Sequence, residues 1–124
     1  MLKFHAVIHG GEPSATAPLS VSFEQALAAL KRLDRLFIEP DGSFVWRGIL
    51  ADGGAWQVDG NLIDRGDALA YAELKGCCAA ESFNAMLAAF GWPKAKLIFQ
   101  LTQRGVILHE WEFRQLASSE VGAV

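Results

Sequence analysis

The chain opens with an alternation of apolar and polar side chains that predicts a β-strand over residues 2–9. Successive side chains of a strand point to opposite faces, so the alternation divides the strand into two sets. These sets are Leu2, Phe4, Ala6 and Ile8 on one face and Lys3, His5, Val7 and His9 on the other. We expect the first set to face the core.

Two stretches with apolar residues at helical spacing predict helices that begin at Ser22 and Ser82. Gln25 follows Ser22 by three residues, which is the pattern of a capping box. Residues 22–30 and 82–90 share a Ser-Phe start and a later Leu-Ala-Ala, and a predicted hairpin follows each. This indicates an internal duplication of a helix–hairpin unit; the alternative is that helix composition alone accounts for the match.

The positions of turn residues predict where the remaining strands begin and end. Asp41-Gly42 predicts a tight hairpin turn, Gly60 predicts a bulge, and Gly76 is expected to end a strand. The strands are predicted over residues 36–39, 44–47, 56–63, 68–75, 97–101 and 106–113.

Together these elements predict an α+β fold, a mostly antiparallel sheet with two helices on one face. We expect a single domain over residues 1–116 and a frayed tail over residues 117–124. The element order over residues 2–113 resembles tandem strand-helix-strand-strand proteins, such as the small effector-binding domains of some bacterial multidrug-responsive regulators. No motif of that family matches residue by residue, so the resemblance implies an order of elements and no ligand, activity or site.

Composition narrows the classes of function. Hydrophobic residues make up 52% of the chain and charged residues 20%, which predicts a globular protein with apolar surface left for self-association. The net charge is -3 and the basic residues are scattered, so we expect no nucleic-acid partner. No apolar run approaches the ~20 residues that cross a bilayer, and the N-terminus lacks a signal-peptide core. Two adjacent cysteines suit a reducing compartment, so a cytoplasmic location is expected.

The cysteines and histidines are candidates for reactive chemistry. Cys77 and Cys78 precede the second helix, where the helix dipole favours a thiolate, but cysteine is also a common small core residue. His5 and His9 are four apart on a strand, roughly 13 Å from each other and too far to chelate one metal. His109 could join them only if the sheet curls, and pairing with Glu110 or Glu112 is the alternative. We therefore predict no metal, no cofactor and no catalytic residue.

Four tryptophans in a chain of this size favour a role in binding. The leading hypothesis is a small binding or protein-interaction module, forming a homodimer through its sheet, whose partner is itself, a small apolar ligand or another protein. The predicted ligand-binding residues are Trp46, Trp56, Tyr71, Glu73 and Trp111. The apolar residues expected at the dimer surface are Val7, Phe37, Val45, Tyr71 and Leu108. The alternative is a small enzyme or redox-sensing protein that uses His5, His9 or Cys77.

Overall fold

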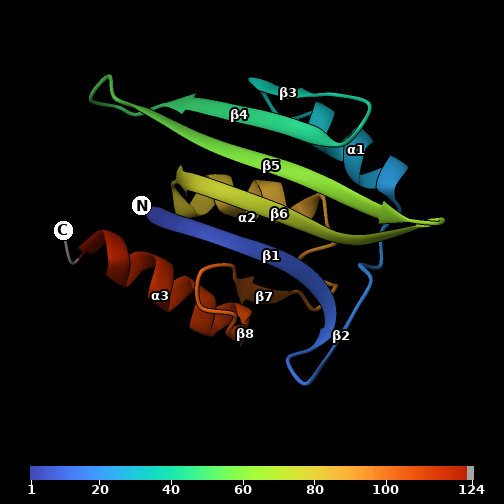
Figure 1. The fold of residues 1–124 in the computed structure, drawn as a ribbon. Helices are drawn as coiled ribbons and strands as arrows, with labels where there is room; N and C mark the ends of the chain where they lie inside the picture. Colours follow the sequence, from blue (N-terminus) through green and yellow to red (C-terminus); the bar gives the residue numbers. More distant parts are fainter. Residues whose placement is uncertain (123–124) are drawn as a thin grey trace.

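A computed structural model describes the backbone of residues 1–122 and the side chains of residues 1–118. It confirms the α+β class: an antiparallel eight-stranded sheet runs in the order β3-β4-β5-β6-β1-β7-β8, with β2 paired to the end of β1 (Figure 1). The strands are β1 (Leu2–Glu12), β2 (Ala15–Ala17), β3 (Leu36–Ile38), β4 (Ser43–Ile49), β5 (Ala55–Arg65), β6 (Ala68–Cys78), β7 (Ile98–Leu101) and β8 (Ile107–His109). The helices are α1 (Phe23–Lys31), α2 (Ala80–Ala88) and α3 (Glu110–Gly122).

The core lies between the sheet and the helices α1 and α2, which both lie behind the sheet in Figure 1. The predicted alternation of β1 is confirmed, because Leu2, Phe4, Ala6 and Ile8 are all buried. Phe4 meets Phe83 of α2 with ring centroids 5.0 Å apart. The opposite face of the sheet is left without either of these two helices.

Local capping chemistry explains the start of α1. The Ser22 hydroxyl accepts a hydrogen bond from the Gln25 backbone N–H at 3.1 Å, and the Gln25 side chain accepts one from the Ser22 N–H at 2.9 Å. The predicted capping box is therefore confirmed. Helix α2 differs, since its N-cap is Ala79 without a side-chain bond and Ser82 lies inside the helix. Ser22 and Ser82 thus hold different helical positions, and the structure does not show the internal duplication.

Two glycines of the central strands accommodate aromatic rings. A Cβ on Gly60 would lie 2.0 Å from the Phe44 ring, and one on Gly48 would lie 2.1 Å from the Trp56 ring. Gly60 pairs regularly with Phe44 and Leu74, so the predicted bulge at Gly60 is wrong. The register of β5 against β6 shifts between Ile63 and Asp64 instead. The packing of the Phe44 ring, and not a bulge, explains why residue 60 is a glycine.

The prediction that Gly76 ends its strand is also wrong, because β6 continues to Cys78. Gly76 has a φ of 147°, a conformation that side chains disfavour, and an added Cβ would lie 2.1 Å from the Gln57 carbonyl oxygen. Glycine at this position lets β6 keep its pairing with both β1 and β5. The residue maintains the sheet where we expected it to break the strand.

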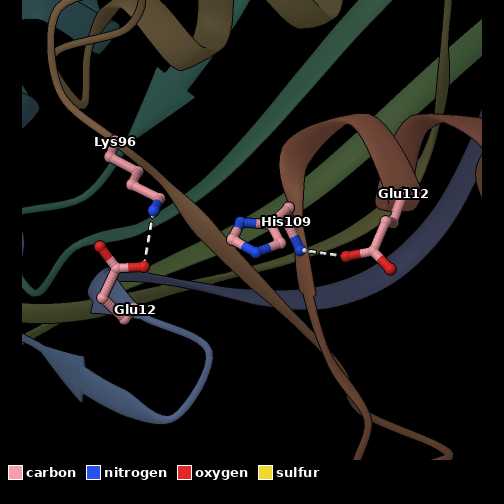
Figure 2. Close-up of polar contacts among 4 residues, drawn as sticks. All are labelled: Glu12, Lys96, His109 and Glu112. Atoms are coloured by element: carbon pink, nitrogen blue, oxygen red, sulfur yellow. Dashed lines mark hydrogen bonds and ion pairs between the residues drawn. The ribbon is translucent and has the colours of Figure 1, made fainter.

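The C-terminal segment departs most from expectation. The predicted strand over residues 106–113 is short, ending at His109, and α3 begins at Glu110. The Glu112 carboxylate accepts a hydrogen bond from the His109 backbone N–H at 3.0 Å, which caps the helix (Figure 2). Phe113 and Ala117, one turn apart, are 1% and 3% exposed. Residues 117–122, expected to fray, are helical, and residues 123–124 of the predicted tail lie outside the described residues.

None of the helices described between residues 1 and 122 combines the length and apolar character needed to cross a membrane.

Candidate functional site

A pocket of about 640 Å³ is bounded by strands β1, β4, β5 and β6, by α3 and by the end of β7 with the loop that follows it. Its floor comes from the polar set of β1 and its neighbours on β6. Lys3 pairs with Cys77, and His5 pairs with Lys75, so all four side chains belong to the face opposite the core. Antiparallel register therefore gathers on one surface residues that are far apart in the sequence.

The wall of the pocket is formed by α3 and the loop between β7 and β8. Strand β7 pairs with β1 only over Ala6–His9, which leaves the start of β1 without a strand partner on that side. Helix α3 packs there instead, next to the start of β1 (Figure 1). The apolar side chains of α3 that line the pocket are Phe113, Leu116 and Ala117.

The loop that follows β7 closes the same side of the pocket. The Thr102 backbone N–H donates a hydrogen bond to the His5 carbonyl oxygen at 3.2 Å, which holds the loop against β1. Gln103 and Arg104 of this loop line the pocket. On the far side, Arg47 and Gln57 continue the floor, with Arg47 Nε donating to Gln57 Oε1 at 3.1 Å.

Positive charge gathers around this pocket although the chain carries a net charge of -3. The residues with cationic side chains that line it are Lys3, Arg47, Lys75 and Arg104. Within the described part of the chain, no Asp or Glu lines the pocket. Two acidic side chains contact residues of the lining: Glu73 Oε2 lies 3.4 Å from His5 Nε2, and Asp59 accepts a hydrogen bond from Gln57 at 2.9 Å.

The two cysteines occupy opposite faces of β6. Cys77 is half-buried and lines the pocket, whereas Cys78 is buried in the core. Burial, with a smaller contribution from the neighbouring Cys77, raises the pKa of the Cys78 thiol to about 12. Cys78 is therefore protonated at neutral pH, and only Cys77 is placed to react with a molecule in the pocket.

The five residues proposed from the sequence as ligand-binding are not brought together. Trp56 lines the pocket, and Trp46 is buried beside it with ring centroids 4.9 Å apart in an edge-on arrangement. Trp46 also donates its indole N–H to the Asp34 carbonyl oxygen at 2.9 Å, so it is part of the core and not of the pocket lining. Glu73 pairs with His5 at the margin.

The other two lie apart from the pocket lining. Tyr71 packs against the His9 ring at 5.8 Å, and Trp111 is 63% exposed on α3. The residues that sequence reasoning missed are the lysines. Lys3 and Lys75 were both assigned to strand faces, but the register that places them side by side is not a local property of the sequence.

The histidines do not form a metal centre within the described residues, where no three His, Cys, Asp or Glu side chains gather. His9 Nε2 lies 3.0 Å from Gln100 Oε1. His109 contributes its backbone N–H to Glu112 as a helix cap, whereas we had considered a side-chain pair with Glu110 or Glu112. Glu12, near His109, receives a hydrogen bond from Lys96 at 2.6 Å, which lowers the pKa of the Glu12 carboxyl (Figure 2). These contacts tie the end of β1 to the segment before β7.

Comparison of the chain with protein-family models, with curated proteins and with solved structures gave no match.

Proposed function

We propose that the protein is a small binding module that takes a low-molecular-weight ligand with an apolar body into the pocket between the sheet face and α3. The observation that carries the proposal is the pocket itself. Its volume of about 640 Å³ falls within the range of ~300–1,000 Å³ typical of small-molecule sites. An apolar wall from Leu101 and Leu116 facing a polar floor provides both contact area and orientation.

Binding without catalysis is favoured by the hydrogen bonding of the reactive groups. Nucleophilic catalysis requires a nucleophile and a base within hydrogen-bond reach of each other. Cys77 and His5 both line the pocket, but no hydrogen bond joins them, and the His5 ring pairs with Glu73. The alternative, a small enzyme or redox sensor using His5, His9 or Cys77, requires a rearrangement of this pair or a group brought by the substrate.

A titration with phenylnaphthylamine, an uncharged probe that fluoresces in apolar sites, tests the proposal. We expect saturable binding to the wild type, and weaker binding to Ala55→Trp, because Ala55 is exposed and lines the pocket. Ala51→Trp is the matched control, since Ala51 lies on the neighbouring turn and outside the lining. Equal affinities for all three proteins, or no saturable binding, would refute the proposal.

Self-association through the sheet is a second proposal, supported by an apolar pair at the β3 edge. Phe37 is 71% exposed and pairs with the half-buried Val45 on β4. Leu108, which we expected at the same surface, is only 9% exposed and cannot contribute to it. In sedimentation equilibrium, Phe37→Glu should shift a dimer to monomer, whereas Val106→Glu, at an exposed site outside the β3–β4 pair, should not. A wild type that stays monomeric at high concentration removes this proposal.

A further inference from the structure

We infer that the ligand of this pocket is an organic anion: an apolar body that carries one carboxylate, sulfonate or phosphate group. The inference rests on the proposed function and adds the charge of the ligand to it. It comes from the placement of Lys3, Lys75 and Arg47 on the floor of a pocket that no acidic side chain of the described residues lines.

Lys3 and Lys75 form the centre of this arrangement. Lys3 lies opposite Cys77, and Lys75 precedes Cys77 by two residues, so the two lysines are diagonal neighbours on one face of the sheet. Diagonal neighbours on adjacent strands are ~7–8 Å apart, close enough for two ammonium groups to meet one anion. Neither lysine has an ion-pair partner among the described residues. Two like charges repel each other, and an anion between them would relieve that repulsion.

The acidic side chains at the margin offset only part of this charge. Asp59 pairs with Lys75 across the strands and keeps its negative charge, because the Gln57 amide that donates to its carboxylate is neutral. The Glu73 carboxylate lies 3.4 Å from His5 Nε2. The three cationic side chains Lys3, Lys75 and Arg47 therefore outnumber these two carboxylates. Arg47 uses one N–H for Gln57, and the described residues offer its remaining four N–H groups no acceptor.

The apolar side of the pocket argues against a small inorganic anion as the whole ligand. Leu116 of α3 and Leu101 of β7, both half-buried, contribute carbon surface to the same volume that the lysines border. A free inorganic ion would leave that surface in contact with water, whereas an organic anion covers it while its charged group reaches the lysines. The pocket therefore suits an amphipathic molecule.

A matched pair of probes separates this inference from the proposed function. Anilinonaphthalene sulfonate differs from phenylnaphthylamine by its sulfonate group alone. At low salt we expect the sulfonate to bind the wild type about tenfold more tightly, because two exposed ammonium groups attract it. Added sodium chloride should reduce this preference through screening.

The double variant Lys3→Gln/Lys75→Gln should lose the preference and retain its affinity for the uncharged probe. Lys31→Gln/Lys94→Gln is the control, because it removes the same net charge at exposed positions outside the pocket lining and should keep the tenfold difference. Equal wild-type affinities for the two probes, or a preference that survives the Lys3/Lys75 change, would overturn the inference. Binding of the uncharged probe that remains sensitive to Ala55→Trp would in that case still support the proposed function. Failure of both probes to bind would overturn both.

Discussion

Cys77 lies directly opposite Lys3 in the antiparallel pairing of β1 with β6, two residues after Lys75 on its own strand. The thiol therefore lines the pocket, at a strand position next to those of Lys3 and Lys75. This position makes Cys77 a natural reporter of the charge and occupancy of the pocket, whether or not it has a chemical role of its own.

Alkylation should distinguish the two thiols. Native protein treated with iodoacetamide at neutral pH is expected to label Cys77 and to leave Cys78 unmodified, because Cys78 is buried and its pKa is raised to about 12. Tandem mass spectrometry can assign the label to one residue or the other. Labelling of Cys78 in the folded protein would show that the core opens at this point.

The charge of the reagent should matter at Cys77. Iodoacetate is an anion, whereas iodoacetamide is uncharged. The ratio of the iodoacetate rate to the iodoacetamide rate should be higher for Cys77 than for mercaptoethanol, because positive charge concentrates an anionic reagent locally. The ratio should fall toward that of mercaptoethanol as salt is added. The Lys3→Gln/Lys75→Gln variant provides the control. A ratio for wild type no higher than that of the small thiol would contradict the electrostatic description of the pocket.

Stability should fall at alkaline pH through Cys78. The unfolded thiol has a pKa near 9.0 and the folded one about 12, so above pH 9 the unfolded state releases a proton that the folded state retains. The free energy of unfolding is therefore expected to decrease between pH 9 and about 12, by up to ~1.4 kcal/mol per pH unit. Denaturant melts of wild type and Cys78→Ala should differ in this slope, and Cys77→Ala should retain most of the wild-type slope, because Cys77 makes only the smaller contribution to the raised pKa of Cys78. Identical slopes for wild type and Cys78→Ala would contradict a raised pKa of the Cys78 thiol in the folded protein.

Gly60 should not tolerate a larger side chain. In Gly60→Ala the new methyl would lie 2.0 Å from the Phe44 ring, so we expect a loss of ~1–3 kcal/mol in the free energy of unfolding. Gly54→Ala serves as the control because its nearest neighbour is the Asp52 carboxyl oxygen at 3.0 Å, at the end of a short side chain in an exposed turn. Urea denaturation measures both. If the two variants are equally stable, the close packing of Phe44 on Gly60 is wrong.

Local signals explain what could be predicted of the fold. The β1 alternation, the capping box at Ser22 and the hairpin at Asp41-Gly42 each depend on neighbours within a few residues, and all three were confirmed. The failures depend on distant contacts. Residues 106–113 carry a plausible strand pattern, but Phe113 belongs to a helix because its ring stacks on Phe99, 4.5 Å away, and contacts Phe4.

The pocket was beyond prediction for the same reason. Its floor depends on the pairing of β1 with β6, and its wall exists only because α3 replaces a strand beside the start of β1. Tryptophan content pointed toward binding, yet only Trp56 of the proposed residues lines the pocket. The lysines carried no signal in the sequence because isolated lysines on strand faces are ordinary.

The polar contacts that hold α3 in place can be tested separately. The Glu110 carboxylate accepts hydrogen bonds from the Trp92 indole at 2.8 Å and from Arg114 Nε at 3.0 Å, and the Arg114 guanidinium lies over the Phe83 ring. Glu110→Ala leaves the mostly buried Arg114 without its carboxylate, so a loss of ~1–3 kcal/mol in stability is expected. Glu39→Ala, at an exposed position, should change stability little. A Glu110→Ala protein as stable as wild type would show that α3 is held by apolar packing alone.

The most direct test of the central claim measures the alkylation rate of Cys77 by iodoacetamide as a function of anilinonaphthalene sulfonate concentration. If the ligand occupies the pocket, the rate should fall and level off at the same probe concentration that saturates the fluorescence, because the probe covers the half-buried thiol. In Ala55→Trp both transitions should move to higher probe concentration together. A probe that saturates by fluorescence while the Cys77 rate stays constant would bind elsewhere, and the pocket would not be the ligand site.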